Sequence, residues 1–228
     1  MQLMTKQDLI LKQQQGLSLV ELLVALVVNI ILLSALIAAF SSTISHYNNV
    51  NNADTLNQQL ESALLLMAND IRRAGYWGNA MNDVNTGLNN NPFMAADTDV
   101  SINGGNNCIL FTYDYDNNGS VQAVTSASDD ERYGFRVVNQ TLQARPPGAP
   151  FDCTAAASAW ENVTNPSILR ITALSFSLST ATVPAGQASK VMQIRSVNIS
   201  ITGQLTSDAT VTKTLTQQVR IRNDKYIP

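Results

Sequence analysis

The chain has 228 residues, of which only 14% are charged, and its formal net charge is -3. This length leaves room for one sizeable domain beside a hydrophobic segment, since domains typically hold about 100 to 150 residues. A weakly charged, slightly acidic chain is not expected to bind nucleic acid over a broad surface, because that function requires a basic face.

An apolar run dominates the N-terminal part of the sequence. Residues 17–40 contain one charge, Glu21, and the run is long enough to cross a bilayer, which requires about 20 apolar residues. An unpaired carboxylate is costly in hydrocarbon, so Glu21 is a candidate functional residue that needs a partner. A secretory signal is cleaved at small residues after its apolar segment. Here the small residue, Gly16, comes before the run.

Residues 16–26 read GLSLVELLVAL, and they resemble the class III signal of type IV prepilins. The resemblance implies that a membrane peptidase cleaves after Gly16 and methylates the new N-terminus, Leu17. The family usually has Phe at this position, and Leu17 changes the bulk of the side chain but not its apolarity. Glu21 matches the glutamate that, in this family, pairs with the N-terminal amine of a neighbouring subunit.

A long helix is predicted to follow, because residues 17–74 contain neither proline nor glycine. Its first part is apolar on all sides, whereas residues 41–52 are rich in Ser, Thr and Asn, so a frayed or bent segment is expected there. Beyond them, apolar residues recur at three- and four-residue steps and require a partner surface. This stripe consists of Leu56, Leu60, Leu64, Met67, Ile71 and Ala74.

Gly75 is predicted to end the helix, directly after Arg72 and Arg73, which complement the negative end of the helix dipole. Residues 70–78 read DIRRAGYWG and resemble the end of the long helix in PilW-type minor pilins. This second resemblance lies far from the first and implies a particular subfamily of pilins.

Strands are predicted from residue 108, where the apolar period becomes two. The expected strands are residues 108–115, 121–125, 132–139, 141–144, 168–178, 191–205 and 210–222. In the last of them, apolar and polar side chains alternate, which indicates one buried and one solvated face.

The predicted fold class is therefore α+β: a long N-terminal helix, with an apolar transmembrane half and an amphipathic half, packs against an antiparallel β-sheet domain. The pilin resemblance implies the same arrangement. The predicted parts are a leader peptide (1–16), a transmembrane and assembly helix (17–40), its amphipathic continuation (41–74), a connecting loop (75–107) and a β-rich globular domain (108–228).

Two cysteines, Cys108 and Cys153, have no neighbouring His or Cys to complete a metal site. In an oxidising compartment they are expected to form one disulfide that closes a long loop. The alternative is two free buried thiols in a cytosolic protein, and the membrane signal favours the disulfide.

A possible calcium loop begins at residue 114, where the sequence reads DYDNNG. Its oxygen ligands would come from Asp114, Asp116 and Asn118. The acid that such a loop needs at its last position is replaced by Thr125. Three acids further on could supply oxygens only through a different loop geometry: Asp129, Asp130 and Glu131. A turn between strands uses the same residue types, so a turn is preferred, and neither a metal nor another cofactor is predicted.

Motifs for catalysis are missing from the sequence. His46 is the only histidine, and it is expected to lie in solvent or at the level of the lipid headgroups. No second base is available to build a Ser-His-Asp or Cys-His arrangement, and no phosphate-binding glycine loop is present. We therefore predict no enzymatic activity.

The resemblance implies a minor pilin of a type IV pilus that helps to prime assembly and so supports twitching motility, adhesion or DNA uptake. Its implied partners are the prepilin peptidase, other minor and major pilins and, before assembly, inner-membrane lipid. No direct binding of nucleic acid is predicted. The implied location is the inner membrane, single-pass with a periplasmic C-terminal domain, and then the pilus fibre or its tip at the cell surface.

Three alternatives remain. A minor pseudopilin of a type II secretion system shares the signal, the helix and the sheet. A secreted soluble protein would use the apolar run as an ordinary signal peptide, cut near residues 39–41, but the length of the run and Glu21 argue against it. A membrane-anchored enzyme would require clustered catalytic groups, and the sequence offers none.

Overall fold

The computed structural model describes residues 16, 18–81, 90–122, 129–186 and 190–227. The chain divides into two compact units, Met1–Val50 and Asn51–Pro228. The elements follow in the order α1 (Leu19–Ile71), η1 (Pro92–Met94), β1 (Ser101–Ile102), β2 (Cys108–Thr112), β3 (Arg132–Val138), β4 (Thr141–Ala144), η2 (Ala157–Ala159), β5 (Glu161–Asn162), β6 (Leu169–Pro184), β7 (Val191–Leu205), β8 (Thr212–Arg220) and β9 (Lys225–Ile227).

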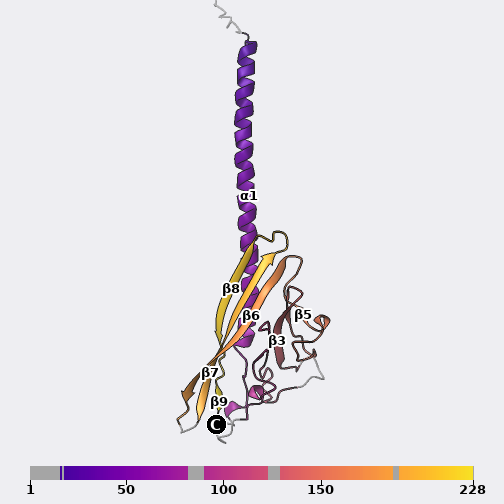
Figure 1. The fold of residues 1–228 in the computed structure, drawn as a ribbon, viewed down its shortest axis with the longest axis vertical. Helices are drawn as coiled ribbons and strands as arrows, with labels where there is room; N and C mark the ends of the chain where they lie inside the picture. The colour runs from indigo at the N-terminus through magenta and orange to yellow at the C-terminus, as the bar shows by residue number, and fades with distance from the viewer. Residues whose placement is uncertain (1–15, 17, 82–89, 123–128, 187–189, 228) are drawn as a thin grey trace, which may run out of the picture. The chain divides into compact units, whose positions relative to one another are not determined.

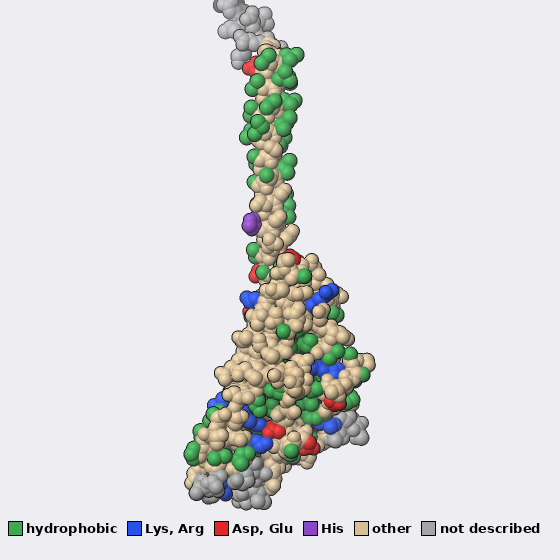
Figure 2. Space-filling view, in the orientation of Figure 1, with side chains coloured by type: hydrophobic (Ala, Val, Ile, Leu, Met, Phe, Trp, Pro, Cys, Tyr) green, Lys and Arg blue, Asp and Glu red, His purple; other side chains and the backbone are tan. Residues whose placement is uncertain are grey.

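The first unit contains the apolar part of α1. Every large hydrophobic side chain from Leu19 to Phe40 is exposed, with exposed fractions between 48% at Val28 and 76% at Leu19. Figure 2 shows such side chains along the visible face of this stretch. Within the part of the chain that the structure describes, α1 is the one helix that is long and apolar enough to cross a membrane. The predicted all-round apolar character is therefore present.

The helix continues without interruption through residues 41–52, where a frayed or bent segment was expected. Two hydroxyl groups of this stretch form hydrogen bonds within the helix itself. Thr43 Oγ1 donates to Ala39 O at 3.0 Å, and Ser45 Oγ donates to Ser41 O at 3.0 Å. A hydroxyl that bonds to the carbonyl one turn earlier keeps its hydrogen bond within the helix, at a small cost in helix stability. Weak helix propensity is thus not enough to break the helix here.

The second unit is built around the amphipathic end of α1. The predicted stripe is buried, and two alanines lie between its larger members. The buried helix residues are Leu56, Leu60, Ala63, Leu64, Met67, Ala68 and Ile71. The helix ends at Ile71, three positions before the predicted end, and a turn leads to Gly75, whose φ of +72° suits a residue without a side chain. Gly75 N then donates to Thr112 O of β2 at 2.8 Å.

Two antiparallel sheets cover this helix end, where the sequence predicted one. The first has the order β1-β2-β3-β4-β5, and the second has the order β6-β7-β8, with β9 beside β7. Figure 1 shows β6, β7 and β8 as long strands alongside the last turns of α1. Two backbone hydrogen bonds join β6 to loops of the first sheet. Ile171 N donates to Gln140 O between β3 and β4 at 2.8 Å, and Phe176 N donates to Asn106 O between β1 and β2 at 2.7 Å. Both sheets contribute to one hydrophobic core with α1. The α+β class with one long helix and antiparallel strands is confirmed.

Some of the strand bounds agree with the sequence pattern. β4 and β7 have the predicted bounds, and β6 continues past the predicted residue 178 to Pro184. The final predicted strand, residues 210–222, corresponds to β8, which is two residues shorter at each end. β9 lies beyond that prediction and pairs with the other end of β7. Residues 121 and 122 are not in a strand, and the rest of the predicted strand 121–125 lies outside the described residues. The predicted loop 75–107 contains η1 and β1, and its residues 82–89 also lie outside the described part.

We predict that Leu60→Ala lowers the free energy of unfolding by about 3 kcal/mol, because it leaves a cavity between α1 and β7. Leu60 is fully buried, and its Cδ2 lies 2.9 Å from the point where a Cβ on Gly203 would stand. Denaturant unfolding of the full chain in detergent measures the change. Leu65→Ala is the matched control, since Leu65 lies on the same helix but is 57% exposed. Equal effects of the two substitutions would contradict the described packing.

Candidate functional site

The predicted processing site lies at the start of α1. Gly16 is exposed, and a Cβ added there would meet no atom within 4 Å. Leu17 and the leader residues 1–15 lie outside the described residues. Glu21 is exposed in the first turn of the helix, where the helix dipole favours a negative charge. Cleavage after Gly16, methylation of Leu17 and the pairing of Glu21 stay predictions.

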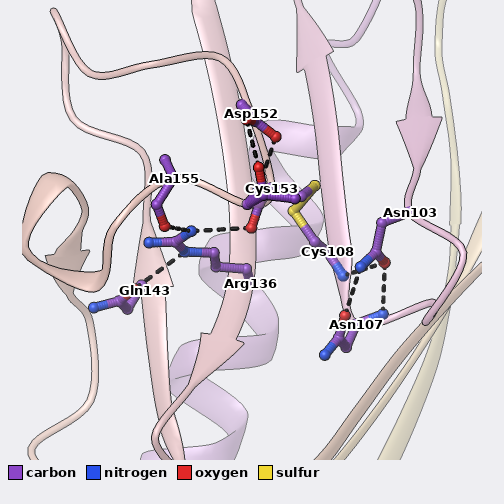
Figure 3. The surroundings of a disulfide bond; sticks show 9 residues. Asn103, Asn107, Cys108, Arg136, Gln143, Asp152, Cys153 and Ala155 are labelled. Atoms are coloured by element: carbon purple, nitrogen blue, oxygen red, sulfur yellow. Dashed lines mark hydrogen bonds between the residues drawn. A yellow bond between two sulfur atoms is a disulfide. The ribbon is translucent and has the colours of Figure 1, made fainter.

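Cys108 and Cys153 form a disulfide, with their Cα atoms 6.0 Å apart. Cys108 opens β2 and is buried, whereas Cys153 lies in the irregular segment between β4 and β5. The bond therefore fastens an irregular segment to the first sheet (Figure 3). This is the pair that the sequence favours over two free thiols.

A buried guanidinium holds the same irregular segment. Arg136 of β3 donates to the carbonyl oxygens of Cys153 at 3.0 Å, Ala155 at 2.7 Å and Ala156 at 3.0 Å. Its Nε donates to Gln143 Oε1 at 3.2 Å (Figure 3). Burial lowers the pKa of Arg136 from its ordinary value, with a partial opposing effect from the charge of Asp152. Since arginine remains charged in proteins, this side chain acts as a cationic hydrogen-bond donor to backbone carbonyls.

Two stretches singled out in the sequence meet in space. The segment that follows α1 contacts the turn that follows β2 through four hydrogen bonds. They are Tyr76 Oη to Asn117 Oδ1 (2.9 Å), Trp77 Nε1 to Gly119 O (3.0 Å), Gly78 N to Asp114 Oδ2 (2.8 Å) and Asp114 N to Tyr76 O (3.0 Å). The aromatic pair of the DIRRAGYWG stretch thus holds the DYDNNG turn in place.

Carboxylates gather at this turn. One oxygen each of Asp114, Asp116 and Glu131 lie within 4.8 Å of one another. Asp114 is 2% exposed and Glu131 is 1% exposed, whereas Asp116 is exposed. Burial raises the pKa of Glu131; backbone N–H groups of Tyr115 and Gln122 oppose this shift, and the charges of Asp114 and Asp116 add to it. Carboxylate oxygens are the ligands that calcium prefers, so these side chains could hold a metal ion.

The pairing of β2 with β3 explains how Glu131 joins the turn. Thr112 is the register partner of Arg132, and Tyr113 N donates to Glu131 O at 3.3 Å. Because the strands are antiparallel, residues just after β2 lie beside residues just before β3. The sequence predicted Asp114 and Asp116 in one candidate loop and allowed Glu131 to join them only if the loop differed from the usual calcium loop. The register of β2 and β3 brings Glu131 to this position.

Two further candidate ligands, Asn118 and Asp130, already have hydrogen-bond or ionic partners. Asn118 donates its amide group to Asp116 Oδ2 at 2.6 Å, and its Oδ1 accepts from Ser120 N at 2.8 Å. Asp130 forms a buried ion pair with Arg145, at 2.7 Å between Nη2 and Oδ2. Burial alone would raise the pKa of Asp130, but the hydrogen bond from Arg145 and the backbone N–H groups bring it below its ordinary value. Thr125 lies outside the described residues.

Comparison with known proteins identifies a family. Residues 49–221 match the family described as prepilin peptidase-dependent protein B. The matched residues include the amphipathic end of α1 and most of the β-rich part, and they leave out residues 16–26. No curated protein and no solved structure matches the chain significantly.

Proposed function

The chain belongs to the prepilin peptidase-dependent protein B family, and on this basis we propose that it is a minor pilin of a type IV pilus, similar to PilW-type subunits, that helps to initiate pilus assembly. The family name implies dependence on a prepilin peptidase. The prepilin-like signal at residues 16–26 supports the same processing, and it lies outside the matched residues 49–221. Two separate parts of the chain therefore support the proposal.

The mechanism is assembly rather than catalysis. The peptidase removes residues 1–16 and methylates the amine of Leu17, and the apolar part of α1 then anchors the chain in the inner membrane. Burying one Leu, Ile or Val side chain is worth about 1.5 to 3 kcal/mol. The exposed apolar side chains from Leu19 to Phe40 therefore favour either insertion into a bilayer or packing against similar helices. Transfer from lipid to a helical bundle is the step that builds the fibre.

Glu21 sets the position of the subunit in that bundle. Among apolar helices its carboxylate loses water, and a buried charge is strongly destabilised unless it is paired. The N-terminal amine of an adjoining subunit provides the opposite charge. A single charged pair in an otherwise apolar interface then distinguishes one axial register from the others, because every other register leaves the two charges unpaired.

The proposed partners and location follow from this mechanism. They are the prepilin peptidase, other minor and major pilins and inner-membrane lipid, first in the inner membrane and then in the fibre or at its tip. The apolar helix is compatible with a membrane anchor that carries a C-terminal domain. The disulfide supports a periplasmic location for that domain, since disulfides persist in oxidising compartments. Twitching, adhesion or DNA uptake would depend on the assembled machine.

Processing is the first test of the proposed function. When the chain is produced with a prepilin peptidase, intact-mass and N-terminal peptide mass spectrometry are expected to find a mature chain that starts at methylated Leu17. Gly16→Leu is expected to abolish cleavage, because the peptidase recognises the glycine. Ser18→Ala, two positions away, is the control and should still be cleaved. A mature chain that starts near Ser42 would instead identify an ordinary signal peptide and contradict the proposal.

Deletion of the gene distinguishes a minor pilin of a type IV pilus from a minor pseudopilin of a type II secretion system. Loss of surface pili with normal release of exoproteins is expected for a type IV minor pilin. Normal pili with reduced release of exoproteins would contradict this function and favour a pseudopilin of a type II secretion system.

A further inference from the structure

The three carboxylates at the DYDNNG turn carry negative charge without an ionic partner. Asp114 follows β2, Asp116 lies in the turn, and Glu131 immediately precedes β3. In the part of the chain that the structure describes, no lysine or arginine forms a salt bridge with any of the three. Like charges at a separation below 4.8 Å repel each other, most strongly where protein excludes water. The arrangement therefore lacks a positive charge.

Asp114 provides a second, independent observation. Its Oδ2 accepts hydrogen bonds from Gly78 N at 2.8 Å and Gly119 N at 3.1 Å. Its Oδ1 is buried and accepts none, and it is the one oxygen among the buried, unpartnered side-chain atoms of the described residues. Buried polar atoms are nearly always paired, so an unpaired oxygen calls for a ligand. Because Oδ1 is a carboxylate oxygen, that ligand is a hydrogen-bond donor or a cation.

We propose that Asp114, Asp116 and Glu131 bind a calcium ion. Calcium takes six to eight oxygen ligands in flexible geometry, whereas magnesium demands a near-ideal octahedron. The turn places Asp114 and Asp116 at the first and third positions of a calcium loop, and Gly119, with φ of +81°, stands at the sixth position, where such loops turn sharply. Glu131 supplies the acidic ligand that such a loop has at its last position, where this sequence has Thr125.

The ion would fasten three segments of the domain together. It binds the end of β2 through Asp114, the turn through Asp116 and the start of β3 through Glu131. Asp114 also accepts from Gly78 N, so the segment after α1 is tied to the same point. The hydrogen bonds to the three carboxylates leave lone pairs for a cation, because each carboxylate offers about four acceptor positions. This inference does not depend on the proposed pilin function.

Calcium binding is tested on the full chain in detergent after treatment with a chelator. Isothermal titration with CaCl₂ should show saturable binding of about one ion per chain. A ligand that binds only the folded state stabilises it, so the Tm should rise by about 5 to 10 °C at a free Ca²⁺ concentration about 100 times the Kd. No binding heat and an unchanged Tm would overturn the proposal. An equal rise with MgCl₂ at the same concentration would overturn it as a calcium site.

Variants identify the residues that bind the ion. Asp116→Asn is the principal variant, because Asp116 is exposed and its loss should not disturb folding. It is expected to weaken Ca²⁺ binding by at least about tenfold. Asp152→Asn is the matched control: Asp152 is also exposed, and its Oδ1 likewise accepts from the backbone N–H two residues later, at 2.8 Å against 2.9 Å for Asp116. Unchanged affinity in Asp116→Asn, or equal losses in both variants, would overturn the assignment.

Discussion

Glu21→Ala is expected to leave cleavage after Gly16 intact and to lower incorporation of the chain into fibres by at least about tenfold. Removing one partner of a buried ion pair leaves the other charge unpaired and costs about 3 to 5 kcal/mol. Each 1.4 kcal/mol corresponds to a factor of about ten in an equilibrium. A tenfold loss therefore remains even if water or a neighbouring group relieves much of the penalty on the unpaired amine.

The comparison is made by quantitative immunoblotting of sheared pili and membrane fractions from cells that produce each variant. Asn29→Ala is the control, because it removes a polar side chain from the same exposed apolar stretch without changing its charge. Normal incorporation of the Glu21→Ala chain would refute the pairing role. A similar loss in Asn29→Ala would show that polarity in this stretch, and not the carboxylate, governs incorporation.

Loss of the disulfide is expected to lower the free energy of unfolding by about 4 kcal/mol. The bond joins positions 45 residues apart, and the entropy of closing a loop of this length in the unfolded chain accounts for that value. For a domain of this size the Tm should fall by about 10 °C. The double variant Cys108→Ala/Cys153→Ala, unfolded by heat under oxidising conditions, provides the measurement.

Reduction of the unmodified chain is the control for this experiment. A reductant should lower the Tm of the unmodified chain to nearly that of the double variant and should leave the variant unchanged. If the variant and the oxidised chain unfold at the same temperature, the disulfide contributes nothing to stability, and the buried network around Arg136 would then suffice to hold the segment from Cys153 to Ala156.

The parts of the fold that could be predicted are those with a long, regular pattern of burial. Leu56 to Ile71 repeat at helical spacing because one side of α1 faces the core, and β7 has the bounds of a long strand pattern. The short strands β1, β5 and β9 have two or three residues each, which is too few for an alternation of inward and outward side chains to repeat. Their place depends on neighbouring strands and not on their own sequence.

The division into two sheets and the position of Glu131 could not be predicted for a related reason. Both depend on which strands pair and in which register. The sequence predicts strand pairing and register only where a short turn joins two strands. β2 and β3 are separated by a long segment, so the pairing of Thr112 with Arg132 could not be predicted from the sequence. A prediction of that register would have placed Glu131 beside Asp114 from the sequence alone.

The position of β7 has a consequence for the order in which the domain folds. β7 pairs with β6 on one side and with β8 and β9 on the other, and its Gly203 lies against Leu60 of α1. The buried residues of α1 are therefore synthesised early, whereas β7, one of the strands that share their core, is synthesised late. Contacts between such distant segments form slowly. The second sheet, and with it the hydrophobic core, would thus be complete only after nearly the whole sequence has been synthesised.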